Sequence, residues 1–249
     1  MNEQIVINGQ LISYLSKSKQ PSNGCLIFLH GWRSNKEIWN NLISKLPEQN
    51  IYAIDLPGFG KSQIPKAPMS VGDYAEVVNE FIKKLDLKNV TIVGHSFGGR
   101  VGIKLASKFP LAISKLVLVD SAGFAMDSTK KSAMGFAAKI AKPFFKPKFM
   151  QGLRKKVYQT IGAEDYVATP ELQKTFVNIT SEDLTNDMKK IVCPTLIITG
   201  QNDTDTPIEF GKKMQSLIPN SKFFILQKAG HFSFLDNQQE FLKEVTSFI

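Results

Sequence analysis

Short apolar runs alternate with longer amphipathic stretches along much of this chain, and the alternation predicts its secondary structure. Eight of these runs have the length and composition of buried strands. They cover residues 5–7, 11–15, 26–29, 51–54, 90–93, 116–119, 195–199 and 223–226. Asn8-Gly9 separates the first two runs, and this dipeptide is typical of a tight β-hairpin turn.

The stretches between the apolar runs predict helices. In residues 71–85, apolar side chains recur three or four positions apart, as on one face of a helix. Similar segments occur near residues 36–46, after Ser96, at 207–218 and at 238–249. Apolar strands separated by helices are typical of parallel sheets that are covered on both faces. The predicted fold is therefore α/β: a mostly parallel eight-stranded sheet flanked by helices.

The alternation stops between Ser121 and Ile191, where the pattern predicts helices without an intervening strand. Pro143 and Pro147 would interrupt any long helix in this segment. We interpret the segment as a helical cap inserted after the sixth strand, over the sheet edge at which α/β proteins bind ligands. The predicted domains are a core formed by residues 1–120 and 191–249, and a cap formed by residues 121–190.

The length of 249 residues is typical of a single enzyme-sized domain. The first residues resemble no secretory signal, and no apolar stretch is long enough to cross a membrane. We therefore expect a cytoplasmic protein. Cys25 and Cys193 have no C-x-x-C partner, so we expect two free, buried thiols and no zinc or redox site.

The net charge of +9 is concentrated in the predicted cap. Nine lysines and arginines and one aspartate lie between Phe124 and Lys156, so this segment carries +8. A local patch of this kind does not indicate nucleic-acid binding. Three interpretations remain: solvated lysines on a packed lid, a site for negatively charged acyl groups, or contact with an anionic membrane. Pro143 and Pro147 argue against the membrane, because they prevent one long amphipathic helix.

The strongest chemical signal is Gly94-His95-Ser96-Phe97-Gly98, which reads G-x-S-x-G. It follows the apolar run at 90–93 and precedes a predicted helix, which is the context of a nucleophile elbow. Glycines let the backbone pass close to itself there, and the helix start favours nearby negative charge. Ser96 is therefore a candidate nucleophile, with phosphate binding or a plain turn as the alternatives.

Four further segments accompany the elbow: Leu29-His30-Gly31-Trp32, Asp55-Leu56-Pro57-Gly58-Phe59-Gly60-Lys61-Ser62, Gly200-Gln201-Asn202-Asp203 with Pro207, and Gly230-His231-Phe232. Through these five motifs, nearly the whole chain resembles the α/β-hydrolase fold superfamily, and within it the capped, esterase-like serine hydrolases. The resemblance implies that serine, acid and histidine follow in this order along the chain.

A serine hydroxyl becomes a nucleophile only when a base removes its proton. His231 is the predicted base, since an imidazole titrates near neutral pH. Asp203 is the predicted acid that orients this imidazole. Asp120, at the end of the 116–119 strand, and Asp205, two residues after Asp203, are alternatives for the acid.

Two other histidines remain. His30 precedes Gly31 in a turn, which we expect it to hold by hydrogen bonds, and His95 occupies the variable position of the elbow. Asp55 and Ser62 are expected to be structural parts of a tight turn. Arg100 is expected to form an ion pair on the surface near the helix start.

The elbow predicts that the backbone N–H of Phe97 is one donor of an oxyanion hole, and the resemblance adds the N–H of Trp32. One such donor is worth about 2.7–4 kcal/mol in the transition state. The side chains of Trp32 and Phe97 are expected either to line an acyl pocket or to pack in the core.

The hypothesis that follows is a serine hydrolase that cleaves a carboxylic ester or thioester of a small-molecule acyl substrate, with no metal or organic cofactor. Ser96 rather than aspartate at the elbow argues against dehalogenase and epoxide hydrolase chemistry. Alternatives on the same fold are a carbon–carbon bond hydrolase, an aminopeptidase, a haloperoxidase and a lyase. A non-catalytic ligand-binding receptor is an alternative of another class. No feature of the sequence predicts an oligomeric state.

Overall fold

A computed structural model describes residues 1–17, 24–46, 50–125, 165 and 168–249. Its eight strands form one sheet in the order β1-β2-β4-β3-β5-β6-β7-β8. They are β1 (Asn2–Ile7), β2 (Gln10–Lys17), β3 (Cys25–Leu29), β4 (Asn50–Ile54), β5 (Val90–His95), β6 (Lys115–Val119), β7 (Thr195–Gly200) and β8 (Ser221–Leu226). β2 runs antiparallel to β1 and β4, and the pairs from β4 to β8 are parallel. The predicted sheet is therefore confirmed.

Asn8 and Gly9 form the predicted hairpin turn between β1 and β2. Both have positive φ, at 50° and 76°, which suits the right-handed twist of the two strands.

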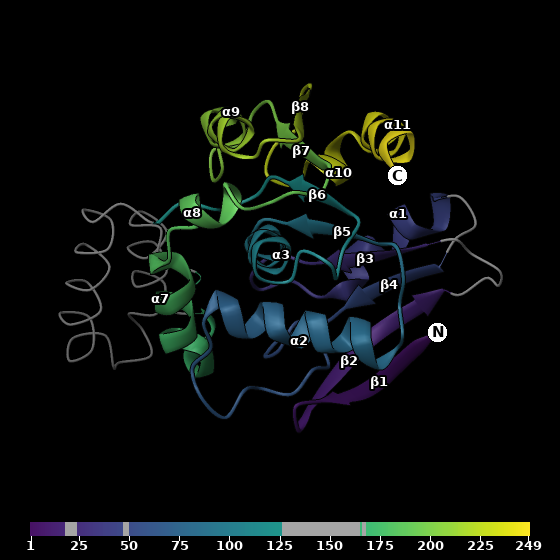
Figure 1. Ribbon diagram of the computed structural model, residues 1–249, viewed down its shortest axis with the longest axis vertical. Coiled ribbons are helices and arrows are strands. Elements are labelled where there is room, and N and C mark those ends of the chain that lie inside the picture. The colour runs from purple at the N-terminus through teal and green to yellow at the C-terminus, as the bar shows by residue number, and fades with distance from the viewer. Residues whose placement is uncertain (18–23, 47–49, 126–164, 166–167) are drawn as a thin grey trace, which may run out of the picture.

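Helices cover both faces of the sheet (Figure 1). One face carries α2 (Val71–Lys84), α3 (Phe97–Lys108), α8 (Thr185–Met188) and α9 (Ile208–Leu217), and the other carries α1 (Asn40–Lys45), α10 (Ser233–Asp236) and α11 (Gln238–Phe248). The predicted helix near residues 36–46 is a 3-10 turn, Lys36–Trp39, followed by the short α1. Ser70 caps α2 in a reciprocal arrangement with Asp73, which explains why this helix begins at Val71.

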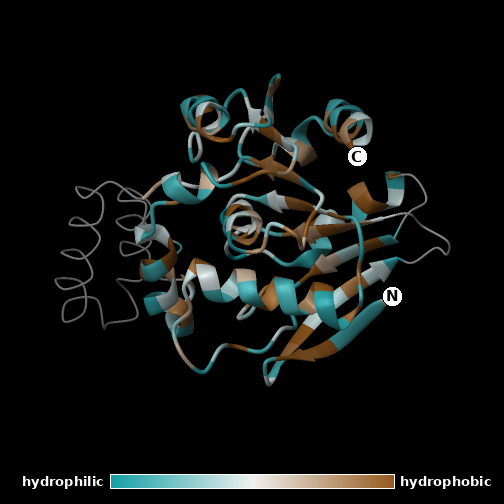
Figure 2. Cartoon of the chain, viewed as in Figure 1, coloured by the Kyte–Doolittle hydropathy of each residue, from teal (hydrophilic) through white to brown (hydrophobic). Residues whose placement is uncertain are grey.

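The two faces explain why a central strand such as β3 is apolar throughout. In β3, Ile27 and Leu29 pack under α2 and α3, while Leu26 and Phe28 pack under α1 and α11. Figure 2 shows hydrophobic residues along the central strands and mixed hydropathy on the covering helices. Each such side chain that is fully buried contributes about 1.5–3 kcal/mol. Cys25 and Cys193 are both buried and free, as expected.

Much of the predicted cap, residues 121–190, lies outside the described residues. This holds for residues 126–164 and 166–167, which include the basic segment and both of its prolines. In the part of the cap that precedes β7 along the chain, the structure describes a 3-10 turn, Pro170–Leu172, followed by α7 (Gln173–Ser181) and α8. The boundaries of the cap stay a prediction.

Arg100 is not on the surface, which corrects that expectation. Its side chain is buried, and it donates hydrogen bonds to the backbone carbonyls of Phe124 and Glu182. Lys104, one turn later in α3, pairs with Glu182 at 2.8 Å and with Asp187 at 2.7 Å. α3 therefore holds the chain on both sides of the insertion, a long-range role that a local pattern does not predict.

Candidate active site

Ser96 lies at the sharp turn between β5 and α3, as predicted for a nucleophile elbow. Its φ of 51° and ψ of −109° are unusual for a residue with a side chain, and such strain costs on the order of 1–3 kcal/mol. The turn also requires Gly98, because a Cβ there would overlap the backbone of Leu29 in β3. The geometry lifts the hydroxyl of Ser96 out of the sheet.

The register of the parallel strands brings the candidate residues to one edge. His95 pairs with Val119 at the ends of β5 and β6, and Gly200 pairs with Leu226 at the ends of β7 and β8. Ser96, Asp203 and His231 all follow these strand ends, so residues far apart in sequence meet at the carboxyl edge of the sheet.

The three side chains form a continuous hydrogen-bonded chain. The Nε2 atom of His231 lies 3.1 Å from the Oγ atom of Ser96, and its Nδ1 atom lies 2.9 Å from Oδ2 of Asp203. The side chain of Asp203 is 0% exposed and that of His231 is 18% exposed. The imidazole of His231 therefore connects a fully buried carboxylate to a hydroxyl at the edge of the sheet.

The surroundings of this pair favour a charged carboxylate and a basic imidazole. Burial raises the pKa of Asp203, but hydrogen bonds from His231 and Thr206 outweigh it, and the net pKa is lowered. Burial lowers the pKa of His231, but the hydrogen bond and charge of Asp203 prevail and raise it. A positive charge on the imidazole of His231 is thereby stabilised.

Thr206 is a part of this site that the sequence analysis missed. Its hydroxyl donates to Oδ2 of Asp203 at 2.6 Å, and its backbone N–H donates to Oδ1 at 3.0 Å. The backbone N–H of Asp205 donates to the same Oδ1 at 2.8 Å, and the side chain of Asp205 is exposed. The spacing of Asp203 and Thr206 in a short loop is the signal that could have indicated a turn built around the carboxylate.

Asp120 occupies a different position. Its Oδ1 atom accepts from the N–H of Gly200 at 2.8 Å, and its Oδ2 atom accepts from the N–H and hydroxyl of Ser233 at 3.0 and 2.6 Å. Burial raises the pKa of Asp120 to about 7, against these hydrogen bonds. Both oxygens are thus engaged away from the imidazole, and Asp120 joins the end of β7 to the start of α10.

The predicted oxyanion donors lie on two segments that meet beside Ser96. Phe97 is the first residue of α3, where a helix has no acceptor of its own for the backbone N–H. A Cβ on Gly31, next to Trp32, would lie 3.4 Å from the Cβ of Ser96. The Trp32 ring is 5.4 Å from that of Phe97, and it also packs on Phe59 at 4.8 Å and Phe176 at 5.2 Å. The two side chains therefore belong to an aromatic cluster beside the hydroxyl.

His30 holds its turn as expected. Its Nδ1–H donates to the carbonyl of Gly31 at 2.7 Å, and its Nε2 accepts from the N–H of Leu56 at 3.0 Å. Burial lowers the pKa of His30 to about 4, so it is neutral.

Asp55 and Ser62 are also structural. The carboxylate of Asp55 accepts from the backbone N–H of Lys61 at 2.9 Å, and the hydroxyl of Ser62 donates to the carbonyl of Asp55. The sequence analysis missed that Lys36, itself buried, pairs with Asp55 at 2.7 Å.

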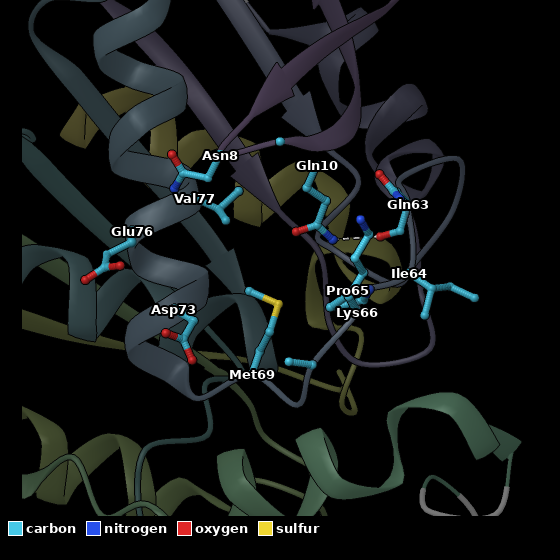
Figure 3. A pocket seen from close by; sticks show the side chains of 12 residues that line it. Asn8, Gln10, Gln63, Ile64, Pro65, Lys66, Met69, Asp73, Glu76 and Val77 are labelled. Carbon is cyan, nitrogen blue, oxygen red and sulfur yellow. Dashed lines mark hydrogen bonds between the residues drawn. The ribbon is translucent and has the colours of Figure 1, made fainter.

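A hollow lies beside the hairpin of β1 and β2, away from the candidate active site (Figure 3). Its volume is about 400 Å³, and it is lined by the Asn8–Gly9 turn, the loop from Gln63 to Met69 and the start of α2. Ser96, Asp203 and His231 do not line it. In the part of the chain that the structure describes, no three His, Cys, Asp or Glu side chains gather as metal ligands, and no helix combines the length and hydropathy of a membrane span.

Two models of known protein families match this chain. A family model for the alpha/beta hydrolase fold matches residues 24–166, more than half of the chain. A model described as TAP-like protein matches residues 175–249. The chain is similar to the pimeloyl-[acyl-carrier protein] methyl ester esterase of Pectobacterium atrosepticum, with 26% identity over 91% of this chain and 94% of that protein.

Two solved structures share the architecture. An esterase from Exiguobacterium antarcticum superposes with a TM-score of 0.79 at 24% identity, covering 100% of this chain and 99% of its own. A bromoperoxidase from Bacillus anthracis superposes with a TM-score of 0.78 at 22% identity and the same coverage. At these identities the structures show a common fold, and their different activities leave the chemistry to be argued from the site.

Proposed function

The chain belongs to the α/β-hydrolase fold family, and within it we propose a serine hydrolase that cleaves a carboxylic ester or thioester through an acyl-enzyme. The observation that carries the proposal is the chain of hydrogen bonds from Asp203 through His231 to Ser96. An imidazole with a carboxylate on one nitrogen and a hydroxyl on the other is the arrangement that activates a serine.

In the proposed first step, the Oγ atom of Ser96 attacks the carbonyl carbon of the substrate while Nε2 of His231 takes the hydroxyl proton. The carbonyl oxygen becomes an oxyanion, which the backbone N–H groups of Phe97 and Trp32 stabilise. The bond to the leaving group then breaks, and His231 returns the proton to the departing alcohol or thiol. The acyl group stays on Ser96.

In the second step, a water molecule attacks the acyl carbon and gives its proton to His231. The bond between the acyl carbon and Ser96 breaks, the carboxylic acid leaves, and the proton returns to Oγ. Asp203 stays ionised throughout and holds the imidazole in the tautomer with hydrogen on Nδ1. This route needs no metal or organic cofactor.

The aromatic cluster beside Ser96 suggests how the acyl group is held. Trp32 is half-buried and packs on Phe97, Phe59 and Phe176, so it offers apolar surface next to the proposed oxyanion donors. We propose that this surface binds the acyl chain of the substrate.

The test is a series of p-nitrophenyl esters, from acetate to palmitate, with purified protein. We expect turnover that Ser96→Ala reduces by about 10⁴-fold or more. Ser62→Ala is the matched control, since this buried serine donates to the carbonyl of Asp55 and lies outside the proposed machinery. Equal turnover by the wild type and Ser96→Ala would refute the proposal, and binding of esters without turnover would favour the receptor.

A further inference from the structure

We propose that His95, the residue before the candidate nucleophile, is a positioning residue that fixes the base His231 through its backbone. The Nε2 atom of His95 lies 2.7 Å from the carbonyl oxygen of His231. The inference rests on the proposed function, because it concerns how the base of that reaction is held.

The protonation of His95 follows from its surroundings. It is 1% exposed, and its ring lies 5.0 Å from that of Phe232 and 5.1 Å from that of Phe234, with Trp39 close by. Burial, aided by the nearby charge of His231, lowers the pKa of His95 to about 3. The ring is therefore neutral near pH 7. Since its Nε2 faces a carbonyl, that nitrogen carries the hydrogen and donates it.

The presence of histidine at position 95, rather than an apolar ring, indicates that the hydrogen bond donated by its Nε2 matters. Among the described residues, Nδ1 of His95 is buried without a hydrogen-bond partner, and a buried unsatisfied nitrogen costs about 1–3 kcal/mol. A phenylalanine would fill the same aromatic cage without that cost. What an imidazole adds is the bond from Nε2 to the carbonyl of His231.

His95 also contacts the segment of the proposed oxyanion donor. A Cβ on Gly31 would lie only 2.9 Å from Nδ1 of His95, so the ring and Gly31 are in close contact. The residue thus touches the Trp32 segment, adjoins Ser96 in sequence and bonds to the backbone of His231. It links all three parts of the site, and its ring also lies 5.0 Å from that of His231.

The loop of His231 is held on each side of this bond. The N–H of Gly230 donates to Asp236 at 2.8 Å, and the N–H of Ser233 donates to Asp120 at 3.0 Å. The bond from His95 is made at His231 itself. It therefore controls most directly whether the imidazole reaches Ser96 and Asp203 together.

The experiment compares His95→Phe with His95→Gln, whose side-chain amide keeps a donor near the position of Nε2. With p-nitrophenyl butyrate, we expect His95→Phe to lower kcat by about tenfold and to leave KM within about twofold. His95→Gln should recover most of that loss. The acidic limb of the pH profile of kcat/KM should move to lower pH in His95→Phe, because a loosened imidazole loses part of its bond to Asp203.

Trp39→Phe is the matched control, because it alters the same cage and leaves the donor in place. Rates are referred to the concentration of sites that react with a fluorophosphonate, so misfolded protein is not counted. A second measurement needs no variant: ¹⁵N spectra of the histidine rings should show His95 neutral, with hydrogen on Nε2, at pH 5.

Three results would overturn the inference. They are an unchanged kcat in His95→Phe, an equal loss in Phe and Gln variants, and hydrogen on Nδ1 in the spectra. Each is distinct from failure of the proposed function, which would show as full activity in Ser96→Ala.

Discussion

Asp203 and Asp120 follow the ends of neighbouring strands, β7 and β6, and both are buried, yet their surroundings shift their pKa values in opposite directions. Burial raises the pKa of both carboxyl groups. At Asp203, hydrogen bonds from His231 and Thr206 outweigh burial and lower the pKa, whereas the pKa of Asp120 rises to about 7. Asp203 bonds to His231, and Asp120 bonds to Gly200 and Ser233. One carboxylate serves the candidate base and the other joins two chain segments.

The comparison shows that position at a strand end does not make a carboxylate a partner of the base. An acid that orients an imidazole needs an oxygen that faces the ring and enough donors to stay ionised. Asp203 has both, because the turn to Thr206 supplies donors and leaves Oδ2 within 2.9 Å of Nδ1 of His231. The oxygens of Asp120 are engaged elsewhere.

The largest expected effect separates the two carboxylates directly. Asp203→Asn should lower kcat for p-nitrophenyl butyrate by about 10⁴-fold, because the wrong tautomer of His231 is favoured. Asp120→Asn should lower it far less, through movement of the loop that carries Ser233. Steady-state kinetics of the two variants, with kcat as the quantity compared, test this prediction. A greater loss in Asp120→Asn would reverse the assignment.

A smaller effect sharpens the role of the turn around Asp203. Thr206→Val removes the hydroxyl that donates to Oδ2 at 2.6 Å. We expect kcat to fall by about tenfold or more, since one hydrogen bond to a charged group is worth about 1.5–3 kcal/mol. Thr204→Val, at an exposed neighbour, is the control. Equal kinetics for both variants would show that Thr206 does not support the carboxylate.

The pH dependence of the wild type tests the pair of Asp203 and His231. Burial lowers the pKa of His231, but Asp203 raises it above the ordinary value of 6.5. Because only neutral His231 can take the proton of Ser96, kcat/KM should fall as pH drops through this raised pKa. A profile of kcat/KM against pH gives the midpoint. A midpoint below 6.5 would contradict the proposed coupling.

The smallest effect on rate is expected for Asp120. The raised pKa of this residue is tested by the pH dependence of the free energy of unfolding. The folded-state pKa of about 7 lies above the ordinary value of 3.8. The folded protein therefore binds this proton more tightly than the unfolded chain, and the resulting stability is lost as pH rises from about 4 to 7. Urea unfolding should show this loss in the wild type and a flatter dependence in Asp120→Asn. Identical slopes would contradict the raised pKa.

The sequence predicted the sheet, the elbow and the residues that meet at the carboxyl edge, because these depend on local patterns. Apolar runs of strand length gave β3 to β8, and glycines around Ser96 marked a turn that only they permit. Asp203 and His231 followed from motif order in a resembling family. The structure then brought these residues within hydrogen-bonding distance of one another.

What the sequence did not predict depends on contacts between distant segments. Arg100 is buried because the carbonyls of Phe124 and Glu182 converge on it. Lys36 is buried because Asp55 lies opposite. Likewise, the donors to Asp120 come from Gly200 and Ser233, which are far from it in the sequence. These arrangements arise only when the strands are in register.

The central claim is that Ser96 is an activated nucleophile, and covalent labelling tests it most directly. The protein is incubated with a fluorophosphonate at neutral pH, and the intact mass and the labelled peptide are determined by mass spectrometry. The account predicts one adduct, on the peptide containing Ser96, lost in Ser96→Ala and much slower in Asp203→Asn. An unlabelled wild type, or an adduct that persists in Ser96→Ala, would contradict it.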